Sequence, residues 1–174
     1  MMDDPGHFGP GGPVDVAWSL LSAVDRGDFD SVWELLDTNH RLCRAQAWLW
    51  SNRSVLLAEG WGSHVDLLPM LLAGPSGHVL WREFAQIEID QLRDSWSGYL
   101  SDFRAGRLGA ASRTRILAPS VEVVLLTPTE GKPVVYEEPT EIVAFALAVR
   151  FDGRVWLVAA YCERLPRDGW PPEI

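Results

Sequence analysis

The chain of 174 residues carries a formal net charge of −9 and is 47% hydrophobic, which fits a single globular domain with a substantial core. An acidic chain is a poor partner for nucleic acid or for an anionic membrane surface, and no stretch approaches the roughly 20 apolar residues that span a bilayer. Cys43 and Cys162 match no metal or disulfide spacing, and residues 1–4 lack the features of a signal peptide, so we expect a cytoplasmic protein.

Helices are predicted throughout the first part of the chain. Residues 1–13 are rich in glycine and proline, and we expect them to form a disordered tail before a single domain of residues 14–174. Apolar periodicity and stop signals predict three helices at the start of this domain, over residues 14–26, 31–37 and about 38–59.

The second and third of these helices have distinct signals. Ser31 and Glu34 fit a capping box for the second helix, and Asp28 or Asp30 is the alternative cap. The third helix is apolar almost all round, which indicates a central position rather than a superficial one.

Two extra helices follow, within about residues 54–105. Ser63 is the expected cap of the first, in which Pro69 should cause a kink. The second is predicted as one long helix over residues 79–104. Its apolar stripe consists of Trp81, Phe84, Ala85, Ile89, Leu92, Trp96, Tyr99 and Phe103.

An arginine-rich segment separates the helices from the strands. It carries Arg104, Arg107, Arg113 and Arg115 around a loop predicted over residues 106–112. Two interpretations stay open: an anion site, or a solvated segment whose arginines pair with carboxylates elsewhere.

Strands are predicted in the remaining third of the chain. They cover residues 116–127 with a break near Pro119, residues 133–138, and a hairpin over residues 141–164. Helices first and strands last predict an α+β fold, in which N-terminal helices pack on a curved antiparallel β-sheet formed by the C-terminal third.

The hairpin turns at Asp152-Gly153, a dipeptide typical of a two-residue type I′ turn. That turn would pair Phe151 with Arg154 and Val149 with Trp156, which places bulky apolar side chains on one face. The other face would be lined with alanine and would end in Tyr161 and Glu163. Neither face of the hairpin has the polar side chains expected of a solvent-exposed sheet surface. We therefore expect other protein elements to cover both faces. We expect helices over the alanine face and a second subunit over the bulky face, giving a homodimer through the sheet.

Two stretches resemble the nuclear transport factor 2-like superfamily of cystatin-like α+β cones, which includes ketosteroid isomerases and polyketide cyclases. They are AWSLLSAVDRGDFDSVWELL near the start and FDGRVWLVAAYCERLPRDGWPP at the end. The C-terminal half is most similar to an actinobacterial branch of that superfamily. The resemblance implies a curved sheet closed by helices, an internal cavity and dimers through the outer face of the sheet. Residues 54–105 depart from the compact members by inserting two helices.

Most catalytic chemistries find no support in the residue pattern. The chain has no G-x-S-x-G motif, its four histidines form no metal-binding pair, and no phosphate-binding glycine loop appears. We therefore expect neither a metal nor another cofactor.

Acid–base chemistry and ligand binding are the two surviving hypotheses. Isomerases of the resembled superfamily use a carboxylate base with a tyrosine, and Glu163, Tyr161 and Glu138 are the candidates for these roles. Alternatively, Glu163 pairs with an arginine at the sheet rim and Tyr161 binds a helix end.

The leading hypothesis is a binding or interaction protein, because no second catalytic carboxylate is evident. It would bind a small apolar ligand in an aromatic-lined cavity, or act as a dimeric interaction module without a ligand. Nine tryptophans are available as cavity walls or as core anchors. His40 and Arg44 share a helix face and either point inward or are surface neighbours. The candidate ligand-binding residues are Tyr136, Trp48, Tyr161, His40 and Arg44.

Overall fold

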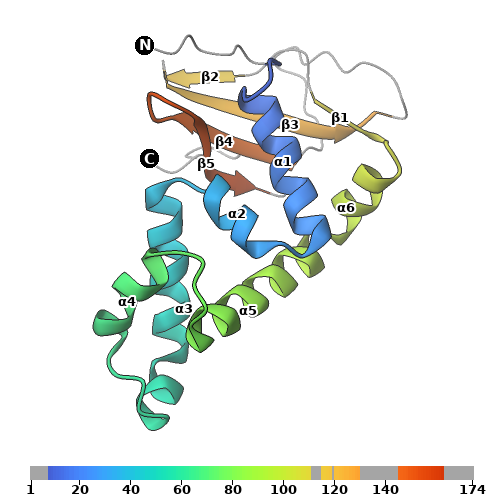
Figure 1. Ribbon diagram of the computed structural model, residues 1–174. Helices are drawn as coiled ribbons and strands as arrows, with labels where there is room; N and C mark the ends of the chain where they lie inside the picture. The colour runs from blue at the N-terminus through green and yellow to red at the C-terminus, as the bar shows by residue number, and fades with distance from the viewer. Residues whose placement is uncertain (1–7, 111–114, 119, 130–144, 163–174) are drawn as a thin grey trace.

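The computed structural model describes residues 8–110, 115–118, 120–129 and 145–162. Within these residues, six helices precede a five-stranded sheet (Figure 1). The helices are α1 Pro13–Arg26, α2 Phe29–Leu35, α3 Thr38–Ala58, α4 His64–Leu72, α5 Val79–Ser95 and α6 Ser97–Arg104. The strands are β1 Leu108–Ala110, β2 Arg115–Ala118, β3 Val121–Pro128, β4 Phe145–Phe151 and β5 Trp156–Cys162. The predicted α+β class is confirmed.

Side-chain caps set the starts of several helices. Asp37 accepts the backbone N–H of His40 and starts α3, and Ser63 accepts that of Asp66 and starts α4 as expected. The capping box predicted at Ser31 is wrong, because Asp28 caps α2 by accepting the Ser31 N–H. Hydrogen bonds from Ser31 also hold the pKa of Asp28 below its usual range.

The long helix predicted over residues 79–104 is two helices. The chain leaves helical geometry at Trp96, whose φ of −99° and ψ of 11° separate α5 from α6. Trp96 is fully buried and its ring lies 4.7 Å from that of Phe145 on β4. The break therefore coincides with the point where the helix pair meets the sheet.

The strands pair in the order β1-β3-β4-β5, and β2 also pairs with β3. All of these pairings are antiparallel. The break predicted near Pro119 is confirmed as a change of strand, because β2 folds back on β3 with Ala118 opposite Val121. The predicted loop over residues 106–112 contains strand β1, whereas the strand predicted over residues 133–138 lies outside the described residues.

The hairpin of β4 and β5 is present, but its predicted register is wrong. Phe151 pairs with Trp156 and not with Arg154, so residues 152–155 form the connection. The Asp152 carboxylate accepts the backbone N–H groups of Arg154 and Val155. This side-chain bonding competes with a two-residue turn centred on Asp152 and Gly153. These bonds also hold the pKa of Asp152 below its usual range.

A bulge in β5 then changes the faces of the sheet. Val149 pairs with Val158, but Ala148 pairs with Ala160, so Ala159 is an extra residue. Beyond it, Tyr161 lies opposite Leu147 on the bulky face and not on the alanine face as predicted.

Helices cover the bulky face, contrary to the expectation that they would cover the alanine face. The side chains of β3, β4 and β5 that join the helical core are Val124, Leu126, Phe145, Leu147, Val149, Trp156 and Val158. Ala146 and Ala148 are also buried but lie outside that core cluster. A second subunit cannot be the cover of the bulky face, because α1 and α3 already pack there.

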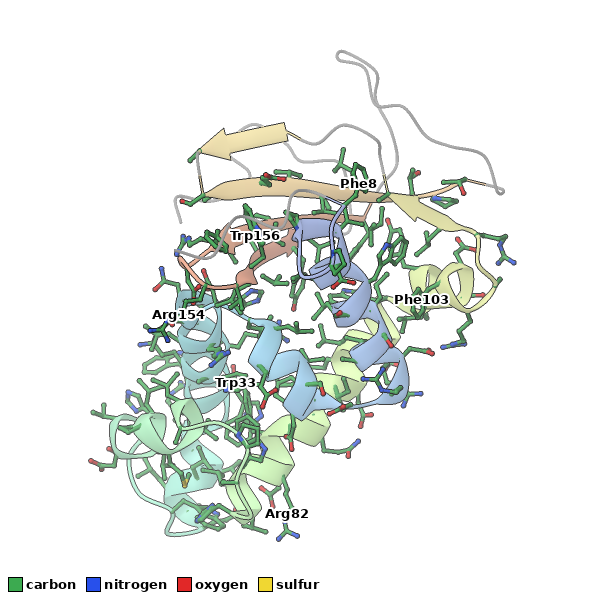
Figure 2. The ribbon with its side chains drawn as sticks, turned by 45° about the horizontal axis from the view of Figure 1, so that its top comes forward. Phe8, Trp33, Arg82, Phe103, Arg154 and Trp156 are labelled. Atoms are coloured by element: carbon green, nitrogen blue, oxygen red, sulfur yellow. The ribbon has the colours of Figure 1, made fainter. Side chains whose placement is uncertain are left out.

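A second packed region lies among the helices, away from the sheet. Trp33 and Phe84 are buried there and their rings pack edge-on at 5.5 Å. Figure 2 shows Trp33 reaching from α2 in between the helices, whereas Arg82 points outward from the start of α5. The expectation that α3 is wholly central is wrong, because Ala47 and Trp50 are exposed.

Within the part of the chain that the structure describes, no helix combines the length and the apolarity needed to cross a bilayer.

Gly153 provides a test of the turn. Its φ of +94° is unfavourable for any residue with a Cβ, so we expect Gly153→Ala to lower the free energy of unfolding by about 1–2 kcal/mol. Gly98 lies inside α6 with no atom near its missing Cβ, so Gly98→Ala should instead stabilise by about 0.5–1 kcal/mol. Urea denaturation of both variants checks the contrast, and equal effects would contradict the assigned turn.

Candidate functional site

The start of α3 is tied to the edge strand β5. Leu36 forms a parallel bridge with Val158, and the Asp37 N–H donates to the Val158 carbonyl at 2.9 Å. The carboxylate of Asp37 is almost fully buried, where it caps α3 and lies 3.3 Å from the Arg150 guanidinium. These contacts hold the first turns of α3 against the end of the sheet.

A buried ion pair lies two turns into α3. The Nε and Nη2 atoms of Arg44 are both 2.5 Å from Oε2 of Glu88 on α5. Nη1 of the same guanidinium donates to the hydroxyl of Tyr161 on β5. The side chains of Arg44 and Glu88 are only 19% and 8% exposed. One arginine therefore joins α3, α5 and the sheet through charge-assisted hydrogen bonds.

His40 lies one turn before Arg44 and also faces Tyr161, with ring centroids 5.1 Å apart. Burial lowers the pKa of His40 to about 4, and the Arg44 charge acts in the same direction. Asp37 and the Val158 carbonyl act in the opposite direction. The imidazole is therefore neutral near pH 7. Its Nδ1 is buried and has no hydrogen-bond partner among the described residues.

Aromatic rings pack around the Tyr161 side chain. The ring of Trp96 packs edge-on against Tyr161 at 4.9 Å, and Phe145 stacks beside Tyr161 at 6.4 Å. The ring of Tyr99 also packs on Phe145, with the centroids 5.2 Å apart. We call His40, Arg44, Glu88, Trp96 and Tyr161 the Arg44 cluster. It combines one charge pair, a hydroxyl and a neutral imidazole with apolar walls.

The structure brings together three of the residues predicted to bind a ligand: His40, Arg44 and Tyr161. Trp48, the fourth, is buried one turn further along α3, where it packs against Phe84 at 5.5 Å in the helical core. Tyr136 and the two carboxylates proposed as bases, Glu138 and Glu163, lie outside the described residues.

Sequence reasoning missed Glu88 and Trp96. Glu88 is four residues after Phe84 and four before Leu92, so it interrupts the apolar stripe of α5 with a carboxylate. A lone acidic residue in such a stripe indicates a buried partner of opposite charge. Trp96 was assigned to the stripe, but its contact with Tyr161 depends on the helix break and on the sheet bulge.

The arginine-rich segment shows ion pairs at two of its members. Arg104 is 2.6 Å from Asp25, and Arg107 is 2.7 Å from Asp102. For these two residues the interpretation as a solvated, paired segment holds. Arg113 lies outside the described residues.

The described part of the chain contains no candidate metal site. No group of three or more histidine, cysteine, aspartate or glutamate residues there is arranged to hold an ion. The Arg44 cluster itself places the guanidinium of Arg44 and the hydroxyl of Tyr161 beside a neutral imidazole.

In comparisons with known proteins, no family profile, no curated protein and no solved structure matches the chain.

The lowered pKa of His40 predicts how stability changes with pH. The folded state takes up the proton near pH 4, whereas the unfolded chain does so near pH 6.5. Between these values the unfolded state binds more protons, so the free energy of unfolding falls as the pH falls from about 6.5 to about 4. The loss attributable to His40 is up to about 3 kcal/mol.

Urea denaturation at several pH values measures that loss. His40→Phe keeps an aromatic ring and cannot protonate, so its stability should fall less steeply over this interval. An unchanged slope in His40→Phe would contradict a neutral buried imidazole.

The Arg44–Glu88 pair predicts strongly non-additive mutations. Arg44→Met leaves a buried carboxylate without its partner and should cost about 3–5 kcal/mol. Glu88→Leu alone should cost a similar amount, whereas the double variant should recover most of the loss because both charges are gone. A double-mutant cycle by chemical denaturation gives the coupling, and additive single effects below 1 kcal/mol would show that the two charges are not coupled.

Proposed function

We propose that this protein binds a small, largely apolar molecule that presents one polar group to the Arg44 cluster. The observation that carries the proposal is the buried guanidinium of Arg44, held by Glu88 and bonded to the hydroxyl of Tyr161. Its aromatic surroundings suit the body of such a ligand, and its polar groups suit one oxygen-bearing substituent.

Stability alone gives no reason for this cluster. Burying two charges has a desolvation cost that their attraction seldom exceeds, so apolar residues of similar volume would serve the fold as well or better. A ligand that accepts hydrogen bonds from Arg44 and Tyr161 would explain why the Arg44–Glu88 ion pair is buried here. Tyr161 is only partly buried, so the proposed ligand would approach the cluster from its side.

The buried Nδ1 of His40 supports the same proposal. A polar atom that is buried without a partner costs free energy, on the order of 1–3 kcal/mol, and this one lies beside the Tyr161 ring. A ligand hydroxyl or carbonyl would supply the missing hydrogen bond, because a neutral imidazole both donates and accepts.

An acid–base enzyme is the weaker alternative. Glu88, the one carboxylate in the Arg44 cluster, has its Oε2 engaged by two N–H groups of Arg44. It therefore serves to hold the arginine and is poorly placed to remove a proton from a substrate. Catalysis of the kind expected from the superfamily resemblance would require Glu138 or Glu163 as the base.

A thermal-shift screen tests the proposal. The panel contains apolar molecules that bear a ketone, a phenol or a carboxylate. A true ligand at 100 times its Kd stabilises the folded state by about 2.7 kcal/mol, which raises Tm by about 5–10 °C in a chain of this size.

Tyr161→Phe removes one hydrogen bond to the ligand and should weaken binding about tenfold. Tyr99→Phe removes the hydroxyl of the other tyrosine that packs on Phe145 and is the control. If a hit binds wild type and Tyr161→Phe equally well, the site lies elsewhere. If no class of molecule raises Tm, the proposal fails.

A further inference from the structure

Helix α3 presents an uncharged stripe to solvent. Cys43, Ala47, Trp50, Ser54 and Leu57 are all exposed, and they follow one another at spacings of four, three, four and three residues. This seven-residue period places them on one face of the helix, in the pattern by which helices pack side by side. We call these five residues the α3 seam.

Large apolar side chains in and beside the seam are unusually open to solvent. Trp50 is 57% exposed and Leu57 is 60% exposed, and Val65 of the adjacent α4 is 66% exposed. A hollow of about 470 Å³ continues from Trp50 between the two helices, lined by Gln46, Leu49, Trp50, His64, Val65 and Leu68. Figure 1 shows that α3 and α4 project away from the sheet, so this surface is accessible to another molecule.

We propose that a second copy of this chain docks here, with its α3 running antiparallel across a two-fold axis at Trp50. The seam has the symmetry that such a contact requires, because a two-fold interface joins each patch to itself. Its members lie seven and three residues before Trp50, and four and seven residues after it. Reversing the helix direction therefore nearly superimposes the seam on itself.

The sizes of the side chains fit the same arrangement. Small residues, Ala47 and Ser54, flank Trp50 on both sides. In the antiparallel pair they leave room for the indole of the other copy, as a knob fits between the residues of a facing helix. At the ends of the contact the small Cys43 meets the larger Leu57 of the partner copy.

Charge does not oppose the contact, although the chain carries −9 overall. No seam residue is charged, and α3 contains no acidic residue at all. The nearest cation, Arg53, stacks on the Trp50 ring at 4.3 Å and donates to the Trp50 carbonyl at 2.6 Å. The seam itself therefore brings no carboxylates of the two copies together.

The exposed apolar area supplies part of what a dimer needs. Trp50, Leu57 and Val65 together expose on the order of 300–400 Å², which is the size of the largest apolar patch on an ordinary monomer. A standard interface takes roughly 800 Å² from each partner, somewhat more than half of it apolar. The seam and the adjacent α4 surface supply most of that apolar part. This surface also replaces the sheet face expected from sequence, which the helices occupy.

The oligomeric state in solution tests this proposal, measured by light scattering and sedimentation over a range of concentrations. Wild type should be a dimer. Trp50→Glu brings two carboxylates together at the two-fold axis, and Leu57→Glu buries a carboxylate against Cys43 of the other copy. Each variant should raise the dimer Kd at least 100-fold.

Val55→Glu is the matched control for these variants. Val55 is 54% exposed on the same helix, but it lies about 100° around the helix from Ser54, so the charge should leave the dimer intact. Circular dichroism and Tm of all three variants separate dissociation from misfolding.

Cross-linking gives a second, geometric readout. In a background of Cys43→Ser and Cys162→Ser, the double variant Ala47→Cys/Ser54→Cys should form a covalent dimer on mild oxidation. Positions 47 and 54 are about 10 Å apart along one helix, too far for a bridge within a copy, but they meet across the proposed axis. Ala47→Cys alone should stay unlinked.

A wild type that is monomeric at all concentrations would overturn the proposal, and so would a dimer that survives Trp50→Glu and Leu57→Glu without cross-linking. The second result would assign the dimer to another surface. A monomer that captures a different protein through Trp50 would likewise overturn the self-association inferred here.

Discussion

The connection between α2 and α3 is held on the edge of β5, and the candidate site depends on that attachment. The Leu36–Val158 bridge and the hydrogen bond from Asp37 to Val158 fix the first residue of α3 against the strand. Because α3 is an uninterrupted helix from that point, the residues one and two turns later lie at fixed positions relative to β5. His40 and Arg44 are those residues, and Tyr161 is the strand residue that they reach. Asp37 is thus both the cap of α3 and its anchor to the sheet.

The sheet contributes an irregularity that is equally necessary. Without the extra residue at Ala159, the alternation of β5 would send Tyr161 to the face away from the helices. The bulge reverses the alternation, so that Tyr161 follows Val158 onto the helix-facing side. Bulges often redirect a side chain in this way next to functional sites. Here the result is a hydroxyl placed between a guanidinium and an imidazole.

The fold class and most helix boundaries could be predicted from sequence because they depend on local signals. Helix α4 after Ser63 and the hairpin around Asp152 are examples. The register of that hairpin could not be predicted, because Asp152 uses its carboxylate to bind two N–H groups of the turn, which changes the residues that pair. The bulge left no local signal either. The face of Tyr161 was therefore assigned wrongly, although its role in the site was proposed.

The candidate site was half predictable for a similar reason. A shared helix face correctly grouped His40 with Arg44, because that spacing is local. Glu88 joins them from 44 residues away, through the packing of α5 on the rest of the molecule. Periodicity can place Glu88 on the buried side of its own helix, but only the three-dimensional arrangement shows which cation it meets.

Helix α3 explains why an apolar pattern alone is ambiguous. Its apolar and uncharged residues surround the helix, and such a pattern is read most simply as full burial. The structure divides them: Ala45, Trp48 and Leu49 face the core, whereas Ala47 and Trp50 face solvent. In the self-association proposed above, α3 would pack on its own chain and on a second copy, and such a helix has an apolar composition like that of a helix buried by one chain. The absence of any acidic residue from α3, in a chain with 24 of them, fits that proposal, because Asp or Glu on either packed side of the helix would be desolvated.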